Sequence, residues 1–243
     1  MQHLENGLTA YEVVAAAEAA SSEAVIETGV EARLILCTLR HYDERQSMET
    51  VKPVEQFKGT YVAGFDIAAD EAGFPIDEHV AAFIYAKENG IFCTAHAGEA
   101  RGADSVWETL KYFGPSRIGH GVRSYEDPAL IEHLVQNKIH LEVCPTFNVQ
   151  IDIYDSYQDH PVDKLYRLNV PLSINTDART IANISLTKEY EKLVTVLNWT
   201  IKDFYNRNVY ALEAAFIPND LRQKLNDKLS KAYKKEDSTT DIF

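Results

Sequence analysis

The sequence has few cysteines and no long apolar run, and each shortage excludes a class of protein. Three cysteines in 243 residues, Cys37, Cys93 and Cys144, are too few and too scattered for a disulfide framework. Each lies in a short apolar segment, so we expect buried free thiols in a reducing, cytoplasmic setting. No apolar run approaches the roughly 20 residues of a membrane-spanning helix. The first residues also lack the basic start and apolar stretch of a signal peptide.

Basic residues are also in short supply. The chain has 24 Lys and Arg against 37 Asp and Glu, which gives a formal net charge of −13. An acidic surface repels nucleic acids and anionic membranes, so neither is an expected partner, whereas a small neutral ligand is not excluded. The length suits one large domain with a substantial core. We therefore expect a single domain over residues 1–243 that ends in a frayed tail, residues 235–243.

Short apolar segments alternate with longer amphipathic ones along the chain. The apolar segments predict strands at residues 32–39, 61–67, 91–96, 117–120, 140–144 and 170–175. The amphipathic ones predict helices at 8–28, 76–89, 103–113, 162–168, 186–199, 202–215 and 218–234, and a further helix that begins at residue 128. This alternation predicts a parallel α/β domain. Because the strand segments are almost continuously apolar, we expect strands that are buried on both faces.

Two parallel architectures compete, an open doubly wound sheet and a closed (β/α)8 barrel. No G-x-G-x-x-G follows a predicted strand, so nothing favours a nucleotide-binding open sheet. Polar, reactive residues instead follow nearly every strand: Arg40 with His41, Asp66, His96, His120, and Asn175 with Asp177. A barrel collects residues from many strand ends at one face, whereas an open sheet concentrates its site at one switch point. We therefore favour the barrel, although six strands are recognisable and not eight.

Histidines and carboxylates follow three of these strands. In HAGE, residues 96–99, an imidazole and a carboxylate could serve a catalytic zinc that keeps one position for water. The alternative is a strand-end His and a Glu that caps the next helix. Glycines on both sides of His120 leave its ring accessible, which suits a ligand or a general base. Asp177 either joins the same site or caps a helix. In a closed barrel the three strand ends would converge.

Six segments carry a resemblance to a known family. In chain order they are LILCTLRH, GFDIAADEAGFP, TAHAGEARGADSV, RIGHGVRSYEDPALIEHL, LEVCPTFNVQ, and SINTD followed by LTKEYE. On these segments, from about residue 7 to 200, the chain resembles the adenosine deaminase family of the zinc-dependent amidohydrolases. The resemblance implies a TIM-type (β/α)8 barrel with extra C-terminal helices. It also implies a hydrolase of purine metabolism that converts adenosine, or deoxyadenosine, to the inosine compound and ammonia.

The resemblance also implies roles for individual residues. His96 and Asp177 correspond to zinc ligands, for one Zn²⁺ per complete barrel. Glu99 corresponds to the acid that protonates N1 of the purine, and His120 to the base that activates and orients the zinc-bound water. Zinc lowers the pKa of bound water toward about 7, and positioned acids and bases then move the protons.

The chain departs from the family pattern at its first motif. The family has a His-x-His pair on the first barrel strand, but the eight histidines here, 3, 41, 79, 96, 120, 133, 140 and 160, contain no such pair. We therefore expect an incomplete, N-terminally truncated barrel with the family's third to eighth strands, and we assign no zinc role to His3. Open edges of such a barrel favour self-association. The missing pair keeps a second hypothesis open, an inactive fragment or pseudoenzyme.

Other departures concern the purine. Ala69 stands where the family usually has a Gly whose N–H contacts the base, and Ala178 stands where a second Asp is common. A related 6-aminopurine such as adenine is therefore the alternative substrate. Phe147 stands where the family usually has a Ser, and the sequence gives no reason for this difference. Asp66 and Asp70 either position substrate or bond nearby groups, the backbone or Arg101 in the case of Asp66.

Overall fold

The computed structural model describes residue 4 and residues 7–237. The chain divides into two compact units, Met1–Ser116 (unit 1) and Arg117–Phe243 (unit 2). Each unit contains three parallel strands and several helices among its described residues. The strand–helix alternation that the sequence predicts is therefore confirmed in both units.

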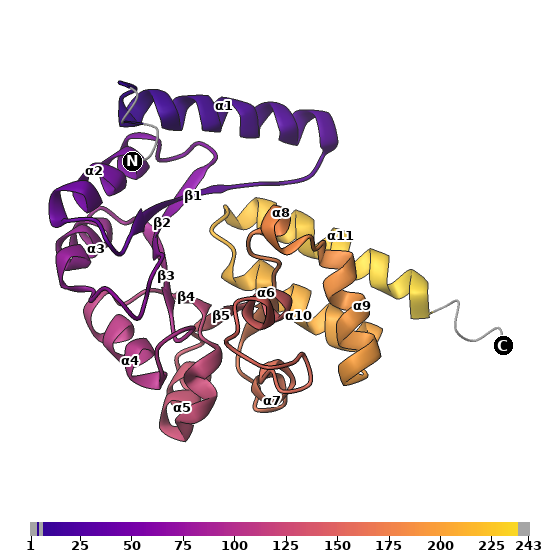
Figure 1. The fold of residues 1–243 in the computed structure, drawn as a ribbon. Helices are drawn as coiled ribbons and strands as arrows, with labels where there is room; N and C mark the ends of the chain where they lie inside the picture. Colours follow the sequence, from indigo (N-terminus) through magenta and orange to yellow (C-terminus); the bar gives the residue numbers. More distant parts are fainter. Residues whose placement is uncertain (1–3, 5–6, 238–243) are drawn as a thin grey trace. The chain divides into compact units, whose positions relative to one another are not determined.

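In unit 1 the three strands lie in the order of the sequence, and helices follow them. The elements are α1 (Ala10–Thr28), β1 (Leu34–Leu39), α2 (Glu44–Gln56), β2 (Val62–Ala68), the 3₁₀-helix η2 (Asp77–His79), α3 (Val80–Glu88), β3 (Phe92–Ala97) and α4 (Ala103–Tyr112). β2 pairs in parallel with β1 and with β3. Figure 1 shows the strands side by side with α2, α3 and α4 along one face.

Local sequence signals fix where the first two helices of unit 1 begin and end. Thr9 and Glu12 form a capping box at the start of α1, and Gly29 ends the helix in the left-handed conformation with φ 67°. Asp43 and Gln46 form a second capping box at the start of α2. Each box satisfies backbone N–H groups that have no partner inside the helix.

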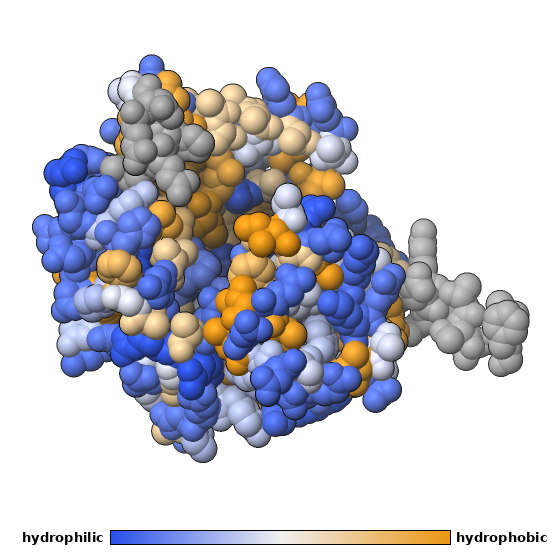
Figure 2. Space-filling view, in the orientation of Figure 1, coloured by the Kyte–Doolittle hydropathy of each residue, from blue (hydrophilic) through white to orange (hydrophobic). Residues whose placement is uncertain are grey.

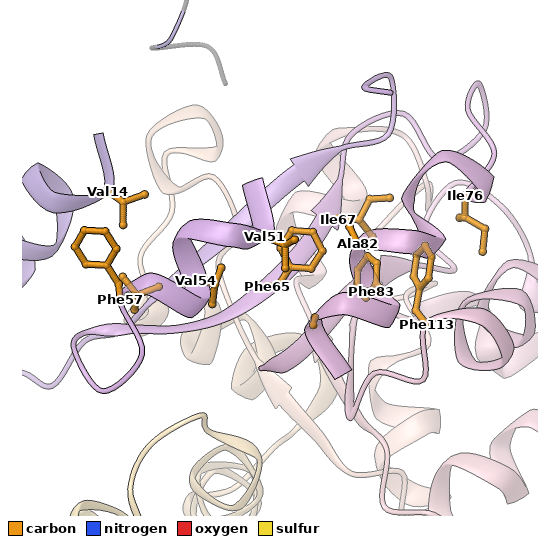
Figure 3. Close-up of a cluster of buried hydrophobic side chains, with 13 residues drawn as sticks. Val14, Val51, Val54, Phe57, Phe65, Ile67, Ile76, Ala82, Phe83 and Phe113 are labelled. Carbon is orange, nitrogen blue, oxygen red and sulfur yellow. The ribbon is translucent and has the colours of Figure 1, made fainter. Parts of the chain in front are cut away.

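A cluster of buried apolar side chains connects the strands of unit 1 to their covering helices (Figure 3). Phe65 on β2 is fully buried, as is Val51 on α2. The rings of Phe83 and Phe113 stack with their centroids 3.8 Å apart. Burying each such side chain contributes about 1.5–3 kcal/mol, so this cluster holds the strand ends of unit 1 in place.

In unit 2 the strands again lie in sequence order, and more helices follow them. The elements are β4 (Arg117–His120), the 3₁₀-helix η3 (Val122–Glu126), α5 (Pro128–Gln136), β5 (His140–Val143), α6 (Pro145–Gln150), α7 (Val162–Arg167), β6 (Leu172–Ile174), α8 (Arg179–Ala182), α9 (Leu186–Leu197), α10 (Ile201–Ala214) and α11 (Asn219–Asp237). β5 pairs in parallel with β4 and β6, with Ile118 opposite Leu141 and Leu141 opposite Leu172. All three side chains are fully buried.

Two expectations about burial are corrected. β2 and β5 are largely buried, but β1 is not buried on both faces, because Cys37 in its centre is exposed. On the other face of β1, Thr38 is buried and its hydroxyl lies 2.9 Å from that of Ser47 on α2. Of the three cysteines, Cys144 is buried as expected, Cys93 is partly buried and Cys37 is exposed.

Two helices also differ from expectation. The helix α2 was not expected, because it is rich in charged residues and contains Pro53. α11 extends to Asp237, so residues 235–237 of the expected tail have helical backbone, and residues 238–243 lie outside the described part.

The long helix α1 presents apolar side chains to solvent. Only Val14 of this helix is buried, while Tyr11 is 58% and Ile26 78% exposed. Figure 2 shows apolar colouring along this helix at the top of the view. Among the described residues, no helix combines the length and the apolar composition that crossing a bilayer requires.

Candidate active site

Unit 1 places His96 at the end of β3, against a buried carboxylate. The Nδ1 atom of His96 lies 3.0 Å from Oδ2 of Asp66 on the neighbouring strand β2. Asp66 also accepts a hydrogen bond from the backbone N–H of Ile67, at 2.7 Å. An ionised carboxylate only accepts, so it favours the His96 tautomer with the proton on Nδ1 and the lone pair on Nε2. Metal-binding histidines are commonly held in this way by a carboxylate.

The loop that carries Glu99 is organised around another buried carboxylate, that of Glu71. Its oxygens accept hydrogen bonds from the N–H groups of residues 98–101, at 2.6–3.0 Å, and from the Ser105 hydroxyl at 2.5 Å. Burial alone would raise the pKa of Glu71, but the hydrogen bonds from Ser105, Arg101, Gly98 and Ala100 outweigh it and lower the pKa below its usual value. Glu71 is therefore a charged anchor that fixes the position of Glu99.

Arg40, at the end of β1, braces the same edge of unit 1. Its guanidinium donates to the carbonyl oxygens of His96, at 2.9 Å, and of Phe74, at 3.3 Å. Its own carbonyl accepts from Nε2 of His79, whose Nδ1 lies 2.6 Å from the Ser47 hydroxyl. These hydrogen bonds connect the end of β1 to the end of β3, to the loop at Phe74 and to η2.

Ala69 and Asp70 follow β2 at the same edge. Ala69 has φ 83°, in the left-handed region that favours glycine. Ala69 is therefore strained at a position where the Gly that the resemblance implies would not be. Asp66 bonds to the backbone and to His96 and not to Arg101, whose guanidinium pairs with Asp104 and Glu108.

Unit 2 brings His120 and Asp177 together. His120 ends β4 and Asp177 follows β6, and His120 Nε2 lies 3.6 Å from Asp177 Oδ2. His120 is 2% exposed. Both residues adopt left-handed backbone conformations, with φ 60° and 54°. His and Asp enter this region more readily than most residue types, and such strained positions concentrate at functional sites.

A thiol completes a donor group around this pair. One donor atom each of His120, Cys144 and Asp177 lie within 4.8 Å of one another. Imidazole nitrogen, carboxylate oxygen and thiolate are all zinc ligands, so the chemistry of this group suits a divalent zinc ion. Unit 2 thus contains a group of residues able to contribute to metal binding.

Behind His120 lies a line of buried polar groups. The side-chain nitrogen of Asn148, on α6, is 3.2 Å from Nδ1 of His120. The side-chain oxygen of Asn148 is 3.2 Å from Nε2 of His160, and Nδ1 of His160 accepts a hydrogen bond from the N–H of Val162 at 3.1 Å. Burial lowers the pKa of His160 to about 3. Asn148 therefore contacts the Nδ1 side of the His120 ring, and the Nε2 side faces Asp177.

The two remaining residues that the sequence singles out are Phe147, after β5, and Ala178, after β6. Ala178 immediately precedes the short helix α8, with its backbone at φ −67° and ψ 77°. Phe147 lies on α6 and is half-buried, and nothing in the structure explains why it replaces a Ser.

Within each unit the structure brings expected residues together, and it adds three that sequence reasoning missed. His96 and Glu99 share one strand end and its loop in unit 1, and His120 and Asp177 face each other in unit 2. The expected joint coordination of a metal by His96 and Asp177 stays a prediction.

The missed residues are Glu71, Asn148 and His160. Their partners are distant in sequence, and the only local signals are an acid directly after GFDIAAD and a His before Pro161.

Comparison with known proteins gives a consistent result. A family model described as adenosine deaminase matches residues 1–232. Adenosine deaminase 1 of Streptomyces coelicolor is 36% identical over 249 residues, covering 96% of this chain and 62% of the relative. An adenine deaminase of Sinorhizobium fredii is 33% identical over 199 residues, covering 82% of this chain and 61% of the relative. The chain thus spans less than two thirds of both curated relatives.

A solved structure extends the likeness to the fold. The crystal structure of adenine deaminase from Arthrobacter aurescens matches with a TM-score of 0.89 at 25% identity, covering 96% of this chain and 71% of that one. The parallel strands, the helix-rich C-terminal part and the deaminase neighbours agree with an incomplete TIM-type barrel. On the family model and these relatives, the chain belongs to the adenosine deaminase family.

Proposed function

We propose that this chain supplies the catalytic strand ends of a hydrolase that deaminates adenosine to inosine and ammonia. Water adds its oxygen to C6 of the purine, the C6–N bond breaks, and the amino group leaves as ammonia. The observation that carries the proposal is the buried His120 beside Asp177, with 3.6 Å between Nε2 and Oδ2. The family model over residues 1–232 supports it.

A zinc ion is the metal that this proposal requires. His96 and Asp177 would hold it, since both are donors of the type that zinc accepts and Asp66 orients the imidazole of His96. Bound zinc supplies Lewis acidity and lowers the pKa of water. Two protein ligands are fewer than the three of typical catalytic zinc sites, so a further donor segment, the family's His-x-His strand, is needed.

Glu99 is the proposed proton donor to the purine ring, and His120 the group that orients the attacking water. Protonation of N1 withdraws electrons from C6 and makes it easier to attack, an effect typically worth 10²–10⁴-fold in rate. Glu71 supports the role of Glu99, because it fixes the backbone of residues 98–101 through four N–H groups.

Adenine is the second candidate substrate. The Sinorhizobium relative and the Arthrobacter structure are both named as adenine deaminases. Ala178 does not separate adenine from adenosine, because the Asp that the family commonly has at this position contacts the purine, which both substrates contain. The inactive-fragment hypothesis remains the alternative from another class, because the chain lacks His-x-His.

The test compares the 243-residue chain alone with the same chain joined to the first two β/α units of a family relative. Deamination is followed by the loss of adenosine absorbance, and in parallel with adenine, at stoichiometric zinc. We expect turnover only in the joined protein. The matched control replaces both histidines of the added His-x-His by Ala. A joined protein that binds zinc and deaminates neither substrate would contradict the proposal.

A further inference from the structure

Three buried side chains in unit 2 form a line that ends at a backbone N–H group. Val162 N–H, the ring of His160, the amide of Asn148 and the ring of His120 follow one another, with contacts of 3.1, 3.2 and 3.2 Å. The three side chains belong to residues that are at most 2% exposed. In such a line, the direction of each hydrogen bond is set by its neighbour, because a buried donor that faces another donor costs free energy.

The direction starts at the backbone. The N–H of Val162 can only donate, so Nδ1 of His160 accepts and carries no proton. A neutral imidazole has one N–H, which is therefore at Nε2 of His160 and donates to the side-chain oxygen of Asn148. Burial supports the neutral form, since it lowers the pKa of His160 to about 3.

The amide of Asn148 transmits this direction to His120. Its oxygen faces His160, so its NH₂ group faces Nδ1 of His120, which must accept. Rotating the amide by half a turn would place its NH₂ against the N–H of His160 and its oxygen against His120. That arrangement sets two donors against each other in a dry interior, at a cost of about 1–3 kcal/mol. The backbone N–H of Val162 therefore determines the orientation of Asn148.

The neutral ring of His120 then carries its proton on Nε2. This is the nitrogen that lies 3.6 Å from Asp177 Oδ2. From the line of contacts we infer that Asn148 and His160 are positioning residues, which fix the ring and the tautomer of His120 so that it presents an N–H toward Asp177.

This inference deepens the proposed function and, for its catalytic part, rests on it. With Nδ1 occupied as an acceptor and Nε2 protonated, His120 orients the oxygen of the attacking water or of Asp177 by donating a hydrogen bond. This differs from the general-base role that the family resemblance implies, and from a metal-donor role of His120 in the group with Cys144 and Asp177, because each role needs a free lone pair on the ring. The orientation of the water then depends on Asn148.

The tautomer is measured directly on the 243-residue chain, without any activity. Long-range ¹H–¹⁵N correlation on histidine-labelled protein distinguishes a ring nitrogen with a proton from one with a lone pair, and the signals of His120 are identified by their loss in His120→Gln. Magic-angle spinning gives the same shifts for an associated sample. We expect the proton of His120, and that of His160, on Nε2. A His120 signal with the proton on Nδ1 would overturn the inference.

The variant Asn148→Asp makes the test sharper. A carboxylate accepts from both rings, so we expect the His120 proton to move to Nδ1 while His160 keeps its proton on Nε2. The matched control is Asn137→Asp, because the exposed Asn137 also has its amide nitrogen near a histidine Nδ1, that of His133, at 3.3 Å. This control should leave the His120 signals unchanged. An unchanged His120 tautomer in folded Asn148→Asp would also contradict the inference.

In the joined protein, Asn148→Asp should lower kcat by about 10–100-fold with little change in KM, the range typical for groups that orient active-site ligands. The two proposals can fail separately. The expected tautomer without any deamination would defeat the proposed function alone. Deamination by a His120 with its proton on Nδ1 would defeat the positioning role alone.

Discussion

Asp66 holds the imidazole of His96 by its Nδ1 atom, with 3.0 Å between the nitrogen and Oδ2. Asp66 is itself fixed, because Oδ1 accepts from the N–H of Ile67 and the residue is 6% exposed. The ring of His96 thus has one preferred orientation and one preferred tautomer before any metal binds, which reduces the entropy lost on binding.

The first prediction tests this relationship. In the joined protein that carries a His-x-His strand, Asp66→Ala should weaken zinc binding by about 10–100-fold, because His96 loses the acceptor that orients it. Zinc content after dialysis, measured by atomic absorption, reports the change. The control is Asp70→Ala, since Asp70 is exposed and accepts a turn hydrogen bond from the N–H of Gly73. Equal zinc retention in both variants would show that Asp66 does not support a metal ligand.

The second prediction concerns Glu71. Glu71→Gln replaces one acceptor oxygen by an NH₂ group, which at the position of Oε2 faces the N–H groups of residues 99–101, so several partly buried donors lose their partner. We expect the free energy of unfolding to fall by about 3 kcal/mol, from about 1–3 kcal/mol per unsatisfied group. Urea unfolding followed by circular dichroism measures it. Glu88→Gln at the exposed end of α3 should change it by less than about 0.5 kcal/mol. Equal stability of the two variants would contradict the anchoring role.

The strands and most helices follow from the sequence, because short apolar segments and helix caps are local signals. The strand at 117–120 and the helix from Pro128 lie where the sequence predicts them. α2 is missed because few apolar residues repeat at helical spacing in this segment and because a proline such as Pro53 usually ends a helix. In the structure Pro53 lies inside α2, where it removes one backbone hydrogen bond without ending the helix.

The candidate site is predicted less completely. The glycines beside His120 and the strand-end position of Asp177 point to both residues in the sequence, and in unit 2 their side chains lie 3.6 Å apart. Glu71, Asn148 and His160 act through contacts across 12 to 34 residues of sequence. No spacing rule predicts such contacts, because they depend on how strand ends and loops pack. The exposure of Cys37 likewise depends on what covers β1 and not on its own segment.

The third prediction concerns acid. Burial, with the nearby Arg117 and Arg207, lowers the pKa of His140 to about 3, from an ordinary value of about 6.5. The unfolded chain therefore binds a proton between these values that the folded chain does not, so the contribution of His140 to stability is complete above about pH 6.5 and is lost as the pH decreases toward 3. His140→Gln should flatten this decrease in urea unfolding measured at several pH values. His133→Gln on α5 is the control. An unchanged slope in His140→Gln would contradict the burial argument.

The fourth prediction concerns backbone strain at Ala69. Its φ of 83° costs an L-residue with a Cβ roughly 1–2 kcal/mol, which glycine does not incur. Glycine loses more entropy on folding, by about 0.5–1 kcal/mol, so Ala69→Gly should stabilise the chain by up to about 1 kcal/mol. Ala100→Gly, at an exposed position of the Glu99 loop, is the control and should not stabilise. A destabilised Ala69→Gly would show that the methyl group makes contacts that outweigh the strain.

The last prediction concerns self-association of the 243-residue chain. Among the described residues of unit 1, β1 pairs only with β2, and Cys37 at its centre is exposed. An edge strand offers unpaired N–H and C=O groups to another chain, and natural proteins protect such edges with lysine. We therefore expect the chain to associate, and Cys37→Lys to shift the mass measured by light scattering toward the monomer. Thr28→Lys, at the exposed end of α1, adds the same charge away from the edge and should leave the mass unchanged. A monodisperse monomer before any substitution would contradict the prediction.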